Sequence, residues 1–113
     1  MNLHQWDIVK VRVRPEDRDE HPAVVLSREE WCQDERKPAV NVLYCTSKRP
    51  ADKPGLCDVP LNGADGLERV TLANCEHVFS VSRAKIAGVL GRVAVERRRQ
   101  IGRMLVSAFR LPL

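Results

Sequence analysis

The chain has 113 residues, a length that suits one domain built on one hydrophobic core, here expected over residues 1–113. Hydrophobic residues make up 43% of it, which excludes a disordered composition, and no apolar run reaches the roughly 20 residues of a membrane-spanning helix. The net charge of +4 is modestly basic and assigns no partner by itself. The first residues lack the basic-then-apolar pattern of a secretory signal, so we expect a cytoplasmic protein.

The first part of the chain predicts three short strands. Residues Trp6–Val13 alternate loosely between apolar and polar side chains, as strands do. Pro22 has no amide donor and suits the entrance of the next strand, Ala23–Leu26, which is wholly apolar and expected to be buried on both faces. Residues 27–30 read Ser-Arg-Glu-Glu, the form of a helix-capping box, so a short helical turn should follow. The third strand, Ala39–Cys45, has the clearest pattern of the chain.

The second part of the chain predicts further strands around a turn. Asp58–Leu61 contains a proline and is therefore expected at an edge of the sheet. Residues 62–66 hold two glycines and predict a turn. Arg69–Leu72 and Cys75–Val81 are interpreted as two separate strand pieces, and Gly88–Val93 as a last strand loosened by its glycines.

Toward the C-terminus the apolar period changes from that of a strand to that of a helix. The side chains near one stripe at 3.6-residue spacing are Val95, Arg98, Ile101, Leu105, Ala108 and Phe109. We expect an amphipathic helix that ends before Pro112 and is anchored by Ile101, Leu105 and Phe109. Gly102 weakens this helix by about 1 kcal/mol relative to alanine, so the helix depends on tertiary packing.

Several short strands followed by one helix predict a mainly β fold of the α+β class. The simplest architecture that closes such strands is an SH3-like, half-open β-barrel with the C-terminal helix packed on it. No internal repeat or linker divides the chain.

The distribution of charge is more informative than its total. Arg12, Arg14, Lys48 and Arg49 flank predicted strand ends, where a cluster of cations can meet phosphate. An ordinary solvated surface would also account for them. Arg97–Arg99 is interpreted as the solvent-exposed face of the terminal helix.

Five motifs in serial order carry a resemblance to a known family. They are Trp6–Val11, similar to a "G-D-I-V/W-x-V" strand with tryptophan in place of glycine; His21–Ser27, similar to "R-P-a-V-v-l-S"; Thr46-Ser47 at a strand end; Gly66–Glu76; and Gly91–Val93 before a helix. Together they resemble the PemK/MazF family, the toxin components of bacterial toxin–antitoxin pairs. The resemblance implies a dimeric SH3-like barrel that cleaves single-stranded RNA without a metal ion or other cofactor, and an antitoxin partner that covers the RNA groove.

The resemblance also implies site residues, and the chain departs from the family at the first of them. The family usually has an arginine before the proline, whereas this chain has His21 before Pro22. A histidine can act as base, acid or phosphate ligand, but it lacks the permanent bidentate charge of a guanidinium. Either the cation has moved to Arg18, Lys48 or Arg49, or RNA cleavage by this chain is weak or absent.

The remaining site residues follow the next strand and a later one. Thr46 matches the residue that holds phosphate through its hydroxyl, with Ser47 beside it; a strand-end threonine that bonds its own backbone is the alternative. Ser47 and the two cations after it, with Arg18, are the predicted contacts of the RNA backbone. Glu76 aligns with a carboxylate that serves some members as a base, although the accompanying arginine is Asn74 here, and a solvated glutamate is the alternative.

Two other functions stay open at this point. A barrel that keeps the fold but not the nuclease would be a module that binds nucleic acid or a protein, and the two departures from the family favour it. Cys75 and His77 lie two residues apart on a predicted strand and, with Cys32 or Cys45, would assemble a metal site. Buried free thiols are the simpler account of these cysteines.

Overall fold

The computed structural model describes residues 2–47 and 53–113, and these form one antiparallel sheet with flanking helices. The six strands run in the order β4-β5-β3-β2-β1-β6. Their bounds are β1 Asp7–Val11, β2 His21–Val25, β3 Ala39–Ser47, β4 Asp58–Leu61, β5 Thr71–Ser82 and β6 Gly88–Arg92. The α-helices are α1 Glu29–Gln33 and α2 Val95–Ala108, and the short 3₁₀ turns are η1 Gly63–Asp65 and η2 Arg83–Lys85.

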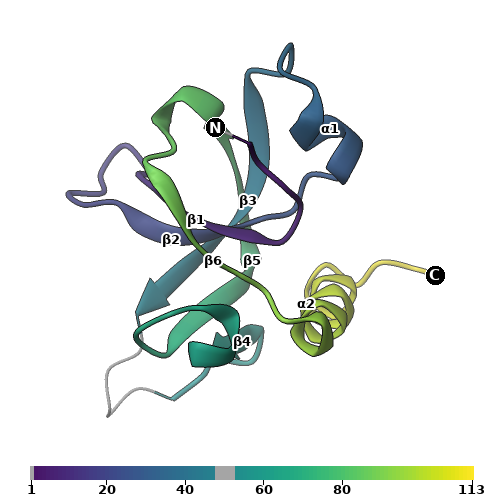
Figure 1. Cartoon of the computed structure of the whole chain (residues 1–113). Coiled ribbons are helices and arrows are strands. Elements are labelled where there is room, and N and C mark those ends of the chain that lie inside the picture. Colours follow the sequence, from purple (N-terminus) through teal and green to yellow (C-terminus); the bar gives the residue numbers. More distant parts are fainter. Residues whose placement is uncertain (1, 48–52) are drawn as a thin grey trace.

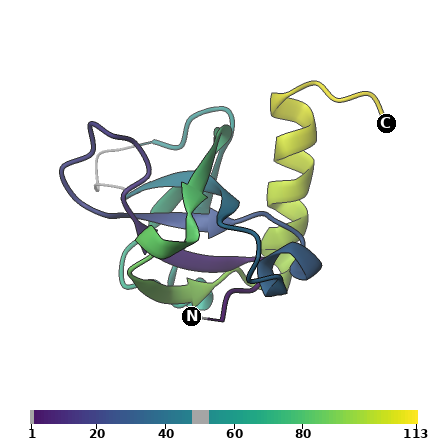
Figure 2. The same cartoon turned by 90° about the horizontal axis from the view of Figure 1, so that it is seen from above.

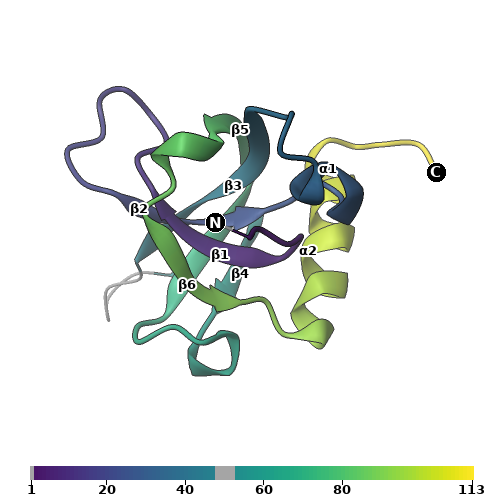
Figure 3. The ribbon, with the colours of Figure 1, turned by 45° about the horizontal axis from the view of Figure 1, so that its top comes forward.

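The predicted half-open barrel with a packed terminal helix is confirmed. The sheet curls strongly, and α2 lies along one side of it (Figure 1). Seen from above, α2 stands opposite the loop between β1 and β2, with the sheet between them (Figure 2). Figure 3 shows α1 on the same side as α2, so the β1–β2 loop and the end of β3 share the side away from both helices. Within the described residues, no helix is long and apolar enough to cross a membrane.

Two apolar cores explain why the central strands are buried on both faces. Alternate residues of a strand point to opposite faces, and the curled sheet covers both. One core contains Leu3, Val9, Val11, Ala23, Val25, Cys32, Val40, Val42, Val81 and Ile86. The other contains Ile8, Val24, Leu43, Cys45, Val59, Leu61, Ala73, Cys75, Val93 and Ile101, and α2 closes it. The expected double burial of the second strand is confirmed for Ala23–Val25, while Leu26 is only partly buried.

The two strand pieces predicted between residues 69 and 81 are one strand. β5 continues through this region because β3 pairs with both halves of it. The register shifts on the way, since Leu43 pairs with Val78 whereas Cys45 pairs with Ala73. The extra residues of β5 bend the strand as a bulge does, which broke the alternation on which the sequence prediction relied. The strand with Pro60 lies at an edge of the sheet, as predicted.

The predicted capping box at residues 27–30 is wrong. Helix α1 begins after Arg28, and no side chain caps it. The Ser27 hydroxyl instead accepts the Asn41 backbone N–H at 2.8 Å, so it links β2 to β3. A capping box does occur at η1, where the Asn62 side chain accepts the Ala64 N–H and the Asp65 carboxylate accepts the Asn62 N–H.

The terminal helix is anchored by fewer residues than predicted. Ile101 is fully buried, and Leu105 packs against the second core together with Met104. Phe109 is a wrong anchor, because α2 ends at Ala108 and the Phe109 side chain is 50% exposed.

The exposed arginine face predicted for residues 97–99 is also wrong in part. Arg97 Nε lies 2.7 Å from Oδ2 of the buried Asp65, and Arg98 donates to the Val93 carbonyl. Asp65 also accepts the Ala94 N–H at 2.8 Å, next to the start of α2. Asp65 therefore ties the turn after β4 to the first turn of the helix, and of the three arginines only Arg99 is fully on the surface.

Candidate functional site

The pairing of β1, β2 and β3 brings His21 and Thr46 to one end of the barrel. Val11 pairs with His21, and Ala23 pairs with Tyr44. If the β2–β3 register is continued by two residues along each strand, His21 lies opposite Thr46 and on the same face as Tyr44. This end lies away from α2 (Figure 1).

A buried carboxylate organises the loop in front of His21. The side chain of Asp17 is 2% exposed. Its Oδ2 accepts the Arg14 backbone N–H at 3.0 Å, and its Oδ1 accepts Arg14 Nε at 3.1 Å and the Tyr44 hydroxyl at 3.4 Å. His21 Nε2 lies 3.9 Å from the same Oδ1. We call these four residues, Arg14, Asp17, His21 and Tyr44, the Asp17 cluster.

The Tyr44 ring is the platform of the Asp17 cluster. The His21 and Tyr44 ring centroids are 5.2 Å apart, and Arg14 Cζ lies 4.6 Å from the Tyr44 centroid. Arg14 Nη2 donates to the Tyr44 hydroxyl at 3.0 Å. On its inner side the ring meets Phe79 edge-on, which joins the cluster to the first core. The rigid core therefore fixes where the imidazole and the guanidinium lie.

The protonation states of the cluster follow from burial and pairing. Burial by itself raises the pKa of Asp17, but the hydrogen bonds from the Arg14 backbone and guanidinium outweigh it, and the net pKa is lowered. The hydrogen bond to Asp17 raises the pKa of Arg14. Burial raises the pKa of Tyr44 above its ordinary value of 10.0. At neutral pH the cluster thus contains a carboxylate, a guanidinium and a phenolic hydroxyl.

Acid is expected to weaken the fold through Asp17. Since its pKa is lowered below the ordinary 3.8 on folding, ionised Asp17 adds stability above that value, and this is lost as the pH falls through the folded pKa. Urea unfolding should show the free energy of unfolding falling more steeply below about pH 4 in the wild type than in Asp17→Asn. Parallel pH profiles of the two proteins would contradict this assignment.

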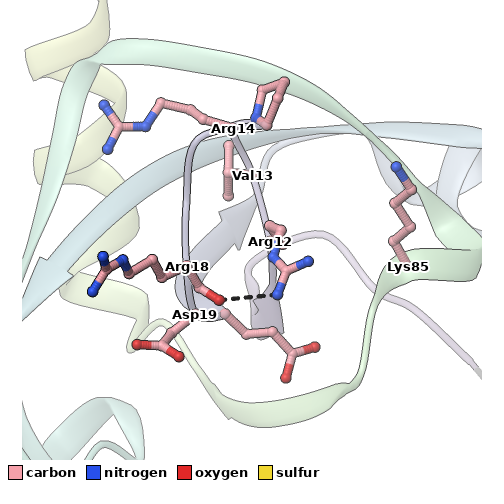
Figure 4. Close-up of a pocket in the computed structure, with 8 residues that line it drawn as sticks. Arg12, Val13, Arg14, Arg18, Asp19 and Lys85 are labelled. Atoms are coloured by element: carbon pink, nitrogen blue, oxygen red, sulfur yellow. Dashed lines mark hydrogen bonds between the residues drawn. The ribbon is translucent and has the colours of Figure 1, made fainter.

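A basic cavity of about 530 Å³ lies beside the cluster. The β1–β2 loop and η2 line it with Arg12, Arg14, Arg18 and Lys85, together with the carboxylates of Asp19 and Glu20. Figure 4 shows that the Arg12 guanidinium donates to the Arg18 carbonyl across this loop, at 3.0 Å. Cations outnumber carboxylates around the opening, so the cavity suits a negatively charged group.

The chain matches an established toxin family over nearly all of its length. The family model of PemK-like, MazF-like toxins of type II toxin–antitoxin systems matches residues 4–109. The chain belongs to this family. Solved structures of PemK/MazF proteins share its fold, although a search of curated proteins finds no match.

Three solved structures illustrate the shared PemK/MazF fold. The Mycobacterium tuberculosis toxin MazF-mt6 is 16% identical, with a TM-score of 0.78 over 95% of this chain and 99% of that one. A mycobacterial endoribonuclease in complex with its cognate antitoxin is 15% identical, with a TM-score of 0.79 over 98% of each chain. A MazE–MazF structure from Deinococcus radiodurans is 17% identical, with a TM-score of 0.76 over 99% of this chain and 100% of that one.

The PemK/MazF site residues predicted near the end of β3 separate between the two faces of the sheet. Thr46 is partly exposed and pairs with Leu72 of β5. Ser47, as the next residue, points to the other face and lines a separate cavity of about 410 Å³ with Pro22 and Arg69. Arg18 is exposed on the rim of the basic cavity. Lys48 and Arg49 lie outside the described residues.

Glu76 lies on the bent part of β5, apart from the Asp17 cluster. Its side chain is exposed, and the described contacts connect it to Cys57 rather than to His21 or Thr46. Burial and then the nearby Glu76 carboxylate raise the pKa of the Cys57 thiol.

The cysteines are placed as packing residues. Cys32, Cys45 and Cys75 are buried, and burial raises the pKa of both Cys45 and Cys75 to about 12. His77 is exposed whereas Cys75 is buried, so the pair does not share a face as a regular strand predicts. Among residues 2–47 and 53–113, no three potential ligands cluster as a metal site would require.

Three members of the cluster, Arg14, Asp17 and Tyr44, were not among the predicted site residues. Arg14 was predicted only as one of the cations at strand ends. An aspartate three residues after an arginine in a proline-containing loop is a weak local signal, because such pairs are common at surfaces. Their contacts with Tyr44 span 30 and 27 positions of sequence, which no local pattern encodes.

Proposed function

We propose that this PemK/MazF-family protein is a cytoplasmic, metal-independent endoribonuclease that cleaves single-stranded RNA. The observation that supports the proposal is the β2–β3 register, which pairs Ala23 with Tyr44 and, continued by two residues along each strand, sets His21 opposite Thr46. The imidazole is backed by the buried Asp17 carboxylate and by the Tyr44 ring. A proton-transfer group and a hydroxyl donor would thus share one end of the barrel.

The proposed reaction uses the 2′-hydroxyl of the RNA as nucleophile. The 2′-oxygen bonds to phosphorus while the bond from phosphorus to the 5′-oxygen of the next nucleotide breaks. A base takes the proton of the 2′-hydroxyl, and the leaving 5′-oxygen gains a proton. The products are a 2′,3′-cyclic phosphate and a 5′-hydroxyl. Donors that meet the non-bridging oxygens stabilise the charge that develops on the pentavalent phosphorus.

We assign the proton transfer to His21, because an imidazole ring can accept a proton at one nitrogen and donate one from the other. The Thr46 hydroxyl donates to a non-bridging phosphate oxygen. Glu76 as a second proton acceptor stays a prediction, since its described neighbour is Cys57. The cations around the basic cavity, Arg18 among them, would hold flanking phosphates without reading the base sequence.

We also propose that a cognate antitoxin binds and neutralises this protein, and that the working form is a homodimer. Two of the similar solved structures are described as complexes, one of an endoribonuclease with its cognate antitoxin and one of MazE with MazF. At 15% and 17% identity these likenesses establish the fold, so the partner here is an expectation to be tested. Co-expression with the protein encoded by the adjacent reading frame, followed by co-purification, is the direct test.

Cleavage of RNA in the presence of EDTA is the expected result for the purified protein. The products of a mixed-sequence RNA should carry 2′,3′-cyclic phosphate ends, which mass spectrometry of the fragments identifies. The same oligonucleotide with 2′-O-methyl groups should remain intact, since it has no nucleophile. A requirement for added Mg²⁺, or products that end in a 5′-phosphate, would contradict this mechanism.

A catalytically silent binding module is the second candidate. It is favoured by His21 at the position where the family has arginine, and by Asn74 where some members have another. A protein that binds single-stranded RNA, measured by fluorescence anisotropy, and leaves it intact over hours would select this function.

A further inference from the structure

We propose that Arg14 is the catalytic cation of this enzyme, donating to the non-bridging oxygens of the scissile phosphate, and that Asp17 is its positioning residue. This inference rests on the proposed RNA cleavage. It names the side chain that takes over from the family's arginine, whose position is occupied here by His21. The role falls on a side chain of the β1–β2 loop rather than on the first residue of β2.

The chemistry of the site requires such a cation. Charge accumulates on the phosphate oxygens in the transition state, and a guanidinium brings a permanent positive charge and N–H donors to them. Imidazole offers at most one N–H in that direction and is needed for proton transfer. A separate guanidinium close to His21 resolves this conflict.

Arg14 is held as a catalytic side chain needs to be. Its Nε and Nη2 lie 3.1 Å from Asp17 Oδ1, its Nη2 donates to the Tyr44 hydroxyl, and its plane lies against the Tyr44 ring. These contacts fix one rotamer of a side chain that is otherwise mobile. Nη1 has no hydrogen-bond partner in the described parts of the chain, and the side chain is 42% exposed. The two N–H groups of Nη1 are therefore available to a ligand.

The guanidinium and the imidazole are close enough to act on one phosphate. Arg14 Nη2 and His21 Nε2 lie 3.1 Å and 3.9 Å from the same oxygen, Oδ1 of Asp17. The Tyr44 ring contacts both groups. The guanidinium and the imidazole therefore border the same site.

The Asp17 carboxylate does not cancel this role. It is 98% buried, so an incoming phosphate meets the partly exposed cation and not this carboxylate. The Glu16 carboxylate is exposed and lies 3.8 Å from Arg14 Nε, on the side of the guanidinium that Nη1 does not use. Arg12, Arg18 and Lys85 around the adjoining cavity supply further positive charge. Pairing with a buried carboxylate also lowers the entropy that Arg14 would lose on binding a phosphate.

The test compares Arg14→Ala with Arg36→Ala. Arg36 is a matched control because it too pairs with an aspartate in a loop. Its Nε and Nη2 donate to Asp34 at 2.9 and 3.0 Å. Among the described residues it makes no contact with the Asp17 cluster. On a cleavable single-stranded RNA, Arg14→Ala should lower kcat about a hundredfold and change KM less than threefold. Arg36→Ala should leave both within twofold.

Chemical rescue separates a catalytic role from a structural one. Methylguanidinium at tens of millimolar should restore at least a tenth of the lost kcat of Arg14→Ala and leave the wild type unchanged. Asp17→Asn should lower kcat about tenfold. The double variant Arg14→Ala, Asp17→Asn should have nearly the kcat of Arg14→Ala alone, because both changes remove the same Arg14–Asp17 interaction. A kcat of Arg14→Ala near that of the wild type, or a loss that follows a lowered Tm and is not rescued, overturns the inference.

The inference stays testable if the wild type binds RNA without cutting it. The proposed nuclease then fails, and Arg14 is judged by binding of a 2′-O-methyl oligonucleotide at several salt concentrations. Loss of one phosphate contact should reduce the slope of log K against log salt by about 0.7 in Arg14→Ala relative to Arg36→Ala. Equal slopes overturn the Arg14 site, and an absence of RNA binding by the wild type overturns both proposals.

Discussion

Replacing Gly91 with alanine is expected to lower the free energy of unfolding by about 3 kcal/mol, or roughly 10–20 °C in Tm. A Cβ at this position would lie 2.2 Å from the Asp65 backbone oxygen and 3.2 Å from Gly66 Cα. Both obstacles are backbone, and Gly66 adopts a left-handed φ of +83°, so neither can rotate away. Because Asp65 also ties the turn to α2, moving it would loosen the helix from the second core.

Gly102→Ala is the matched control for this prediction. Gly102 lies within α2, and a Cβ there would meet nothing within 4 Å. Alanine at position 102 is therefore expected to raise the free energy of unfolding by about 0.5–1 kcal/mol. Thermal and urea unfolding of the two variants measure the difference. Similar effects of the two substitutions would mean that the close approach of β6 to the η1 turn does not exist.

Replacing His21 with alanine is expected to lower kcat for RNA cleavage about a hundredfold, which corresponds to about 2.7 kcal/mol of barrier. The imidazole is the proposed proton-transfer group, and alanine leaves no substitute for it within the Asp17 cluster. Thr46→Ala should cost about tenfold, because one hydroxyl donor to the phosphate is lost while the proton transfer remains. Single-turnover rates with an excess of enzyme measure both effects on the chemical step.

Two control variants test whether these effects are specific to the face of the sheet on which His21 and Thr46 are predicted to lie. His77→Ala removes an exposed histidine of β5 that lies outside the cluster, and Ser47→Ala removes the hydroxyl next to Thr46 that points to the opposite face. Both should retain at least half of the wild-type rate. Cleavage that survives the loss of both His21 and Thr46, or that is lost equally in Ser47→Ala, would remove the proposed site.

Elements with a strong local pattern were predictable from the sequence. The predicted third strand is an unbroken run of mostly apolar residues that favour strands. The observed β3 extends two residues beyond its predicted end at Cys45. The proline of Asp58–Leu61 identified an edge strand, because proline cannot donate to a neighbour on both sides. The failures fall where tertiary contacts override local preference. The bulge in β5 broke the alternation, and the Ser27 hydroxyl bonds β3 rather than the helix.

The residues of the candidate site were only partly predictable from the sequence. The order of motifs predicted His21 and Thr46, and the β2–β3 register, continued by two residues, sets them opposite each other. Ser47 was grouped with Thr46 because they are adjacent in sequence, whereas the pleat of β3 sends successive side chains to opposite faces. The cation near His21 was predicted to be Arg18, Lys48 or Arg49, whereas the structure brings Arg14 to the His21–Tyr44 pair.

By itself, the sequence determined the strands, the terminal helix and the membership of the toxin family, because these depend on residues close together or on the serial order of motifs. The tertiary structure alone decided that Asp17 would be buried, that Arg14 would lie against Tyr44, and that both would meet His21. The physical reason is that these contacts form across strands. Their geometry is set by the register and by the core beneath Tyr44, not by any preference of the loop that carries Arg14 and Asp17.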